Sequence, residues 1–519
     1  MNNDVLRYPI GLQDFEGLKK DGYIYIDKTA ILYKLIKSGK YYFMSRPRRF
    51  GKSLTLSTLK AIFEGKKELF QGLAIYDLEK EWKKHPVFLL SFATFEKSEE
   101  KSLEQLIEFK LNQWETEYGI EPSNQKYSVR FGALLKRAYE HTGERAVVLI
   151  DEYDSALVTT MENEILHTHI KNILRPLYTV IKDYDQYIRF TFITGITRFS
   201  KLTIFSGLNN LNDITLNKEY STICGITQKE LETTFKEGIN QLCQRYKLDY
   251  AEMIMKLKDY YDGYHFSEES EDVYNPFSLL NAFFNKKLSN YWFSTGIPSF
   301  LVEKLKRKDV NLEKYFSQRA NEEILQESDN SSISELSILF QSGFLTIKNF
   351  DLTNQTYGLG IPNREVREGM VKLFMEYYLC PNKLEGQRII FELVDALEGG
   401  DPDRFLRLLR SFLSSVPYDL SKGDKEVYFQ NAFYIIVSLI GLTVKAECHT
   451  SNGSIDLVIT TDEYIYVIEL KLDKKAIDAL RQINEKGYAR AWEFDERKLY
   501  KIGVSFSSLN RNVEDWIID

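Results

Sequence analysis

Short apolar runs and longer segments of helical periodicity alternate through the first 230 residues of this chain. The apolar runs predict buried strands at 41–44, 87–95, 146–150 and 189–193. Helical periodicity fills the intervals between them, most clearly at 52–63 and 102–118. Strands that alternate with helices are typical of a parallel sheet with helices on both faces, so we expect an α/β domain over residues 1–226.

The pattern becomes helical after residue 226. Helices are predicted at 227–246, 250–261 and 276–285, and the polar segment 321–334 predicts an exposed connector. A mixed pattern follows, with apolar stretches at 338–347 and 357–361 and helical stretches at 365–378 and 386–413. We therefore expect a helical middle region over 227–320, followed by a small mixed module with connecting helices over 321–420.

The final hundred residues change pattern again. A helix at 425–440 precedes strands at 443–448, 453–460 and 463–472, and a helix at 476–491 and a strand at 498–506 close the chain. The middle two strands form a hairpin. The order αβββαβ over residues 421–519 predicts a separate α/β domain.

The amino-acid composition excludes several classes of protein. With 43% hydrophobic and 14% aromatic residues among 519, the chain can bury several cores, which excludes a disordered or collagen-like protein. Its 68 Lys and Arg against 75 Asp and Glu give a net charge of −7, which excludes an overall basic coat. The four cysteines have no C-x-x-C spacing. Residues 1–7 lack the apolar core of a signal peptide and no run of 18 apolar residues occurs, so we expect neither a signal peptide nor a membrane span. We expect a soluble, cytoplasmic protein with reduced thiols.

A candidate phosphate-binding loop lies between the first strand and the helix at 52–63. Such a loop needs converging backbone N–H groups, a lysine for the terminal phosphates and a hydroxyl for Mg²⁺. Gly51, Lys52 and Ser53 supply this part of the motif, whereas Arg46 occupies the place of the first glycine. The nucleotide-binding candidates in the loop are Arg46, Arg48, Arg49, Phe50, Gly51, Lys52 and Ser53. The alternative is a solvated basic loop that contacts nucleic acid or acidic side chains.

Two carboxylates follow the buried strand at 146–150. Ligands of open α/β sheets bind at the carboxyl edge of the strands, so Asp151 would hold Mg²⁺ together with Ser53, and Glu152 would polarise the attacking water. Thr194, at the end of the next strand, would sense the γ-phosphate or orient water, and Arg198 would neutralise charge in the transition state. The pattern predicts an ATP or GTP site with Mg²⁺. The competing interpretation is a buried strand that ends in a solvated acidic turn.

A second candidate site lies on the predicted hairpin. Glu469 and Lys471 are two residues apart on one strand and therefore share a face. If Ile459 pairs with Tyr464, Asp456 lies opposite Val467 and diagonal to Glu469.

Asp456 and Glu469 would bind Mg²⁺ or Mn²⁺ there, and Lys471 would position the nucleophile or stabilise the charge on phosphorus. Glu426 and Gln482 are auxiliary candidates, with Glu447 a competitor for the role of Glu426. A hairpin with a solvated polar face is the alternative interpretation.

These motifs together resemble a bacterial family that joins an AAA-ATPase-like domain to a C-terminal PD-(D/E)xK nuclease-like domain. The resemblance covers essentially the whole chain and is carried by Tyr8-Pro-Ile-Gly, Tyr25-Ile-Asp27-Lys28-Thr29, Arg46–Ser53, Asp151-Glu-Tyr-Asp154, Thr194–Arg198, Tyr261–Tyr264, Tyr291–Gly296, Ile361-Pro-Asn363, Asp456 and Glu469-Leu-Lys471. The arginine-rich loop looks like this family's own phosphate loop. The resemblance implies ATP binding, hydrolysis, and a restriction-endonuclease-like fold at the carboxyl end.

The leading hypothesis is an ATP-hydrolysing or ATP-regulated, Mg²⁺-dependent nuclease that acts on DNA, either as a monomer or as a homo-oligomer. The alternative is a nucleotide-dependent switch whose C-terminal domain binds nucleic acid or protein without cleavage. A third hypothesis is a plain ATPase that oligomerises through its last domain.

Overall fold

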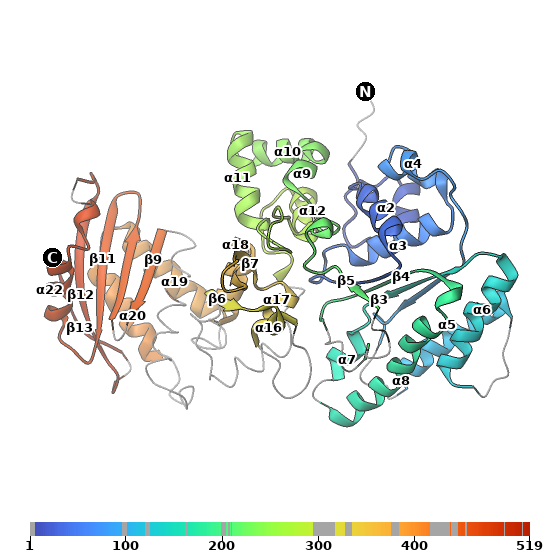
Figure 1. Cartoon of the computed structure of the whole chain (residues 1–519). Helices are drawn as coiled ribbons and strands as arrows, with labels where there is room; N and C mark the ends of the chain where they lie inside the picture. The colour runs from blue at the N-terminus through green and yellow to red at the C-terminus, as the bar shows by residue number, and fades with distance from the viewer. Residues whose placement is uncertain are drawn as a thin grey trace. The chain divides into compact units, whose positions relative to one another are not determined.

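The computed structural model describes residues 6–95, 101–119, 125–160, 163–198, 204–205, 208, 210–293, 317–326, 335–374, 383–415, 436, 445–451, 454–492, 494–510 and 512–519 (Figure 1). The chain divides into two compact units. The first contains residues 1–296 and 317–365, and the second contains residues 297–316 and 366–519. Two predicted boundaries, after residues 226 and 320, fall inside the first unit. No helix in the described ranges has the length and apolar character needed to cross a membrane.

A five-stranded sheet forms the centre of the first unit. Its strands are β1 Tyr41–Ser45, β2 Val87–Ser91, β3 Ala146–Asp151, β4 Ile188–Gly195 and β5 Asn212–Asp213. They lie in the order β2-β3-β4-β1-β5, and every neighbouring pair is parallel. Because β4 lies between β1 and β3, the carboxyl ends of these three strands meet at one edge of the sheet.

Helices cover both faces of this sheet, as predicted (Figure 1). On one face lie α1 Phe15–Lys20, α2 Thr29–Ser38, α3 Lys52–Phe63 and α4 Ala74–Leu78. On the other lie α5 Ser102–Tyr118, α6 Tyr127–Thr142, α7 Ser155–Thr160 and α8 Glu164–Asp183. Apolar side chains of β1, β2 and β3 pack against the second group in a continuous core. Strand β3 is buried along its whole length, which explains its uninterrupted apolar sequence.

The middle region of the first unit contains α9 Gln228–Thr234, α10 Lys236–Tyr246, α11 Tyr250–Tyr261 and α12 Pro276–Asn285. The single helix predicted at 227–246 is wrong. Thr227 and Glu230 form a capping box that begins α9, and the helix ends at Phe235. The Phe235 ring stacks against Tyr8 and Phe283 in the core, and a new helix begins at the following residue.

A small antiparallel sheet completes the first unit. It consists of β6 Ser317–Ala320, β8 Thr356–Gly360 and β7 Thr346–Asp351, in that order, with α16 Glu322–Gln326 and α17 Glu335–Ser342 beside it. The exposed connector predicted at 321–334 is therefore interrupted by a helix, whose Leu325 is fully buried. The predicted helix at 365–378 corresponds to α18 Arg364–Phe374.

The second unit has a five-stranded sheet between helices. The strands β9 Lys445–Ser451, β10 Ser454–Thr460, β11 Tyr464–Leu472, β12 Lys498–Ser507 and β13 Asn512–Ile518 lie in sequence order. α22 Ala476–Lys486 packs on one face, and the hairpin of α19 Lys383–Glu398 and α20 Pro402–Ser415 packs on the other, where Tyr466 donates a hydrogen bond to the Leu397 carbonyl. The last strand, β13, was not predicted. The helix predicted at 425–440 lies outside the described residues.

The hairpin of β10 and β11 has a different register from the predicted one. Ile459 pairs with Tyr466, and Asp456 lies directly opposite Glu469. The shift arises because Thr461 closes the turn, with its hydroxyl accepting a hydrogen bond from the Tyr464 N–H at 2.9 Å. Directly opposed residues on antiparallel strands have Cβ atoms roughly 4.5–5.5 Å apart, which is closer than the predicted diagonal arrangement.

Candidate functional site

The first candidate site lies at the carboxyl edge of the parallel sheet. Ser45, at the end of β1, is paired with Gly195 at the end of β4. On the other side of β4, Ile193 pairs with Ile150, one residue before Asp151. The fold therefore brings together the arginine-rich loop, the acidic turn after β3 and the end of β4, which are far apart in the sequence.

Lys52 is the first residue of α3 and lies close to the centre of the loop. Gly51 caps the helix with φ of 95°, a left-handed conformation that favours glycine. The Lys52 ammonium donates hydrogen bonds to the carbonyl oxygens of Arg46 and Pro47, both at 3.0 Å, and the residue is only 7% exposed. Burial lowers the pKa of Lys52, and the carboxylates of Asp151 and Asp154 oppose this change.

Ser53 and Asp151 form the part of this site that suits a hard cation. Asp151 is buried at the end of β3, and burial raises its pKa, while the nearby Ser53 hydroxyl and the charge of Lys52 lower it. The next residue, Glu152, has φ of 49° and also has its pKa raised, first by burial and then by the charge of Asp151. A hydroxyl and a carboxylate are the oxygen ligands that Mg²⁺ prefers.

Asp154 links the acidic turn to the end of β4. Its Oδ2 accepts hydrogen bonds from the Ile196 N–H at 3.0 Å, the Thr197 N–H at 2.6 Å and the Thr197 hydroxyl at 2.5 Å. The Tyr153 N–H donates to the Thr194 carbonyl at 3.2 Å. The Thr194 hydroxyl is buried and has no hydrogen-bond partner among the residues described. No role was predicted for Asp154, although it lies only three residues after Asp151 in the same motif.

Arg198 lies at the end of this turn and is paired with an acid. Its Nε and Nη2 both donate to Asp213 Oδ2, at 2.9 and 2.5 Å, and its backbone N–H donates to the Gln341 side chain at 3.1 Å. The predicted contact with a phosphate would therefore require Arg198 to exchange this partner. Asp213 belongs to the edge strand β5, and no sequence signal identified it.

Arg46, which we predicted to bind the nucleotide, is hydrogen bonded to backbone groups in this structure. It is 1% exposed, donates hydrogen bonds to the carbonyls of Ser45, Thr215 and Tyr220, and lies 4.2 Å from the centre of the Phe266 ring. Burial lowers its pKa to about 10, so it stays charged at neutral pH. The Arg46 guanidinium therefore stabilises the backbone around the start of the loop. The side chains of Arg48 and Arg49 are exposed and remain candidates for phosphate contacts.

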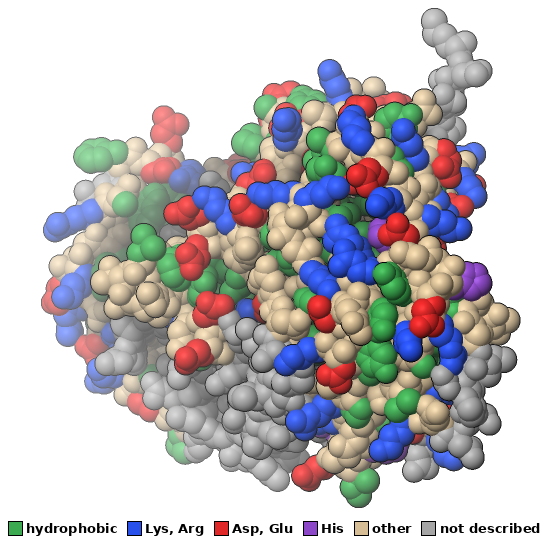
Figure 2. Space-filling model, turned by 45° about the vertical axis from the view of Figure 1, so that its right-hand side comes forward, with side chains coloured by type: hydrophobic (Ala, Val, Ile, Leu, Met, Phe, Trp, Pro, Cys, Tyr) green, Lys and Arg blue, Asp and Glu red, His purple; other side chains and the backbone are tan. Residues whose placement is uncertain are grey.

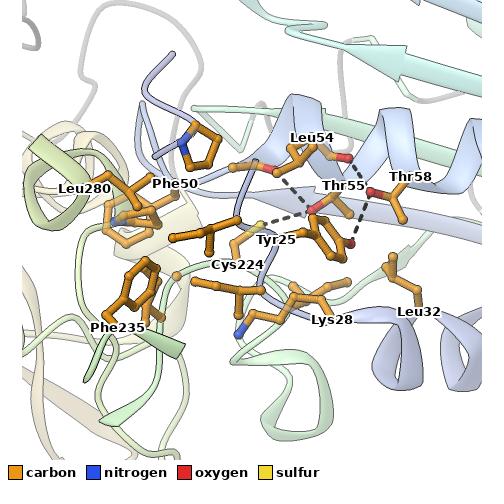
Figure 3. A pocket seen from close by; sticks show the side chains of 18 residues that line it. Tyr25, Lys28, Leu32, Phe50, Leu54, Thr55, Thr58, Cys224, Phe235 and Leu280 are labelled. Carbon is orange, nitrogen blue, oxygen red and sulfur yellow. Dashed lines mark hydrogen bonds between the residues drawn. The ribbon is translucent and has the colours of Figure 1, made fainter. Parts of the chain in front are cut away.

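A mostly apolar pocket adjoins the loop (Figure 3). Its volume is about 620 Å³ including the open mouth. Phe50, Gly51, Leu54 and Thr55 from the loop and α3 form one side, and the other lining residues are Pro9, Ile24, Tyr25, Ile26, Lys28, Leu32, Thr58, Ile223, Cys224, Gly225, Ile226, Phe235, Pro276 and Leu280. The pocket shares Phe50 and Gly51 with the phosphate loop. No motif in the sequence predicted this pocket.

The second candidate site lies in the other unit, on β10 and β11. Glu469 is fully buried, and its Oε1 accepts the Lys471 ammonium at 2.7 Å. Both side chains are on the face of β11 that carries Ile465 and Val467, which pack against α22. Gly503 on β12 is paired with Glu469 and lets α22 pack closely against the sheet, because a Cβ at this position would lie 2.3 Å from the Ala476 carbonyl of α22.

The remaining predicted residues of the second site are only partly described. Asp456 lies opposite Glu469 in the strand register, and its side chain is outside the described residues, as are Glu426 and the side chain of Glu447. Gln482 is on α22, and its side-chain amide donates to the Tyr488 hydroxyl at 3.3 Å. Among the side chains that the structure does describe, no group of three or more His, Cys, Asp or Glu is arranged to hold a metal.

Comparisons with known proteins agree with this division of the chain. Residues 9–205 match a protein-family model described as "Predicted AAA-ATPase", and residues 424–516 match one described as "PD-(D/E)XK nuclease superfamily". The chain is also similar to the "Uncharacterized protein in vnfD 5'region" of Azotobacter chroococcum mcd 1. The two are 34% identical over 522 residues, which cover 99% of each chain. Both predicted domain families, and the α/β fold class, are confirmed.

Proposed function

We propose that this chain, which belongs to the family joining an AAA-ATPase-like domain to a C-terminal PD-(D/E)XK nuclease superfamily domain, is an ATP-dependent nuclease that cleaves DNA with Mg²⁺. The two domain families support a nucleotide-dependent nuclease in general. The observation that carries the finer proposal is the direct opposition of Asp456 and Glu469, with Lys471 bound to Glu469 on the same strand.

At the first site, we assign the triphosphate to the loop and the purine to the adjoining pocket. The loop contributes the N–H groups at the start of α3 and the Lys52 ammonium, which are suited to β- and γ-phosphates. The pocket offers apolar walls such as Phe50 and Leu280 to the flat faces of a base. Ser53 and Asp151 would hold Mg²⁺, which offsets phosphate charge when bound.

Hydrolysis at this site needs a base that orients water. Glu152 follows the metal-binding carboxylate directly, and its raised pKa makes it a stronger acceptor for a water proton. Thr194 offers a buried hydroxyl at the neighbouring strand end, where it can hydrogen bond to water or to the γ-phosphate. The Asp154 carboxylate keeps the turn after Thr194 in place by binding two backbone N–H groups.

At the second site, Asp456 and Glu469 would hold Mg²⁺, or Mn²⁺ in its place, through carboxylate oxygens. The bound metal would supply an activated water and a counter-charge for the scissile phosphate. Lys471 already lies 2.7 Å from Glu469, so its ammonium is beside the metal position and can orient the nucleophile.

Exposed cations near the second site suit a polyanion. Five side chains that follow β11 or lie on and after α22 are exposed: Lys474, Lys475, Arg481, Lys486 and Arg490. Contacts from such residues to backbone phosphates provide affinity that falls steeply with salt. They therefore give a DNA strand a place to bind beside Glu469 and Lys471.

The charge of the whole chain favours one alternative, a nucleotide-dependent switch that binds without cleavage. The net charge is −7, and Figure 2 shows acidic side chains interspersed with basic ones on the visible face. A protein with this surface has only local regions that attract a nucleic acid.

Cleavage assays on purified full-length protein distinguish these functions. Linear, circular and single-stranded DNA would be incubated with Mg²⁺ or Mn²⁺, with and without ATP, beside the variants Glu469→Gln and Lys52→Ala. We expect metal-dependent cutting that Glu469→Gln abolishes and that Lys52→Ala makes insensitive to ATP. Cutting that persists in Glu469→Gln would refute the nuclease assignment, and absence of cutting with intact ATP binding would support the switch.

A further inference from the structure

The phosphate loop adopts a backbone conformation that its residue types do not favour. Loops of this kind commonly use glycines to bring backbone N–H groups close to phosphates, whereas residues 46–50 here contain three arginines, a proline and a phenylalanine. Arg49 nevertheless adopts φ of 68°, a left-handed conformation that is costly for a residue with a side chain. Contacts from elsewhere in the first unit must therefore hold the loop in shape.

Several of these contacts come from residues far along the chain. Pro47 packs against Gly343, where an added Cβ would lie 2.8 Å from the proline ring. The Arg49 guanidinium lies 4.9 Å from the centre of the Phe277 ring. Phe50 is buried edge-on against Tyr264, with ring centres 4.7 Å apart. Each contact joins one residue of the loop to a residue more than 200 positions later in the sequence, and Tyr264 belongs to a motif that the proposed chemistry leaves unused.

Trp292 makes the most directional contact with the loop backbone. Its indole Nε1 donates a hydrogen bond to the Arg48 carbonyl at 3.0 Å, and the residue is fully buried. Its ring also packs against Phe344, with centres 5.3 Å apart. The donor fixes the orientation of the peptide between Arg48 and Arg49, which is the peptide that precedes the left-handed residue.

Glu365 in turn fixes Trp292. Its Oε1 accepts the backbone N–H of Trp292 at 2.6 Å, and its side chain is fully buried. It is the second residue of α18 and follows the Ile361-Pro-Asn363 motif, whose Asn363 side chain donates to the Asp262 carbonyl at 2.9 Å. A chain of two hydrogen bonds thus runs from Glu365 through Trp292 to Arg48.

We propose that Trp292 and Glu365 are positioning residues that set the conformation of the phosphate loop, and thereby its affinity for a nucleoside triphosphate. Glycines within the loop would allow this backbone conformation by themselves. Here, contacts from residues 292 and 365 stabilise it instead. The inference rests on the proposed function for its ligand, but the conformational part holds for the protein without nucleotide. Tyr264 packs against both Phe50 and Trp292, so the same cluster of rings also contacts one wall of the pocket beside Gly51.

The test uses amide hydrogen exchange and ATP affinity of the full chain. Trp292→Phe keeps an aromatic ring and removes the Nε1–H donor, and Glu365→Leu removes the acceptor. Trp114→Phe is the matched control, because Trp114 is a buried indole of α5 that packs against Phe88 and Phe131. Glu365→Gln is the rescue variant, since its amide oxygen can still accept the Trp292 N–H.

Without nucleotide, we expect the amides of residues 48–51 to exchange about tenfold faster in Trp292→Phe and Glu365→Leu than in wild type, because one directional hydrogen bond is lost. The dissociation constant for Mg·ATP should rise roughly fivefold to tenfold in both. Trp114→Phe and Glu365→Gln should stay within about twofold of wild type in both measurements.

Loop exchange in Trp292→Phe that matches Trp114→Phe would overturn the proposal, whether or not ATP binds. General acceleration of exchange across the sheet would also overturn it, since Trp292 would then support only the fold. A wild-type protein that binds no ATP would refute the proposed function instead, and the exchange data would still decide the role of Trp292.

Discussion

The two candidate sites are built in opposite ways. The site on β10 and β11 depends on the register of one hairpin, in which Asp456 and Glu469 are 13 residues apart in sequence and directly opposed. The site at the phosphate loop draws on β1, β3 and β4, and its loop is held by Trp292, Gly343 and Glu365. A local site tolerates distant changes, whereas the loop site depends on contacts from most of the first unit.

This difference separates the residues that perform chemistry from those that position them. On the hairpin, Glu469 and Lys471 bind each other, so the chemical groups are themselves the structural contacts. At the loop, Lys52 and Asp151 are chemical candidates, while Arg46, Asp154 and Trp292 hold the backbone around them. Substitutions should therefore have sharper and more local effects on the hairpin.

The largest effect that this comparison predicts is at Lys471. We expect Lys471→Met to lower the rate of metal-dependent DNA cleavage at least about 100-fold, because it removes the ammonium beside the reacting phosphate and leaves the buried Glu469 carboxylate without this ion pair. Single-turnover cleavage rates measure the effect. Lys474→Met, which removes an exposed lysine three residues later, is the control and should change the rate less than about threefold. Equal losses in the two variants would mean that Lys471 contributes only general positive charge.

Asp154→Ala should have a large effect on stability at the loop site. Its carboxylate accepts three hydrogen bonds from the turn after β4, so its loss should lower the free energy of unfolding by about 3 kcal/mol, as judged from the shift of the urea transition. Asp14→Ala removes an exposed helix cap of α1 and should cost about 1 kcal/mol. If the two variants were equally stable, the turn after β4 would be held mainly by other contacts.

A smaller effect concerns pH. Burial raises the pKa of Glu365 to about 7, while the surrounding N–H groups of Tyr291, Trp292 and Phe293 and the Ser278 hydroxyl oppose the rise. Between the ordinary carboxyl pKa and about 7, the folded protein keeps a proton that the unfolded chain has lost, so stability falls as pH rises. Wild type should lose on the order of 2 kcal/mol relative to Glu365→Gln between pH 5 and 8.

The control for this measurement is Glu16→Gln. Lys20 and Lys66 lower the pKa of Glu16 to about 2, so its contribution to stability is constant above pH 5 and is lost only in acid. The free energy of unfolding of Glu16→Gln should therefore change with pH in parallel with that of wild type from pH 5 to 8. A wild-type profile parallel to Glu365→Gln as well would show that Glu365 titrates normally.

Local signals in the sequence predicted most elements of the fold. The predicted ranges 52–63, 250–261 and 276–285 are the ranges of α3, α11 and α12, because each begins at a capping residue or loop glycine that the sequence displays. The hairpin register was wrong by two residues, since it depends on how the Thr461 side chain closes the turn. Spacing alone cannot predict such a contact.

The candidate sites were predictable only where the chemistry is carried by a short motif. Lys52, Ser53 and Asp151 were proposed from strand ends and residue type, and the structure places them near one another. The burial of Arg46 could not be predicted, because it depends on Thr215, Tyr220 and Phe266, about 170 or more residues away. Trp292 and Glu365 had no predicted role for the same reason.

The dependence of the loop on Trp292 and Glu365 has a consequence during synthesis on the ribosome. Translation proceeds at roughly 5–20 residues per second, so the segment that contains Arg46–Ser53 emerges about 15 to 60 s before Glu365. Once residue 213 has emerged, all five strands of the first sheet are made, but the residues that fix the loop are not. A ribosome that stalled between residues 213 and 292 would present a nascent domain that has its strands and lacks a formed nucleotide site, so the ability to bind ATP would develop only late in elongation.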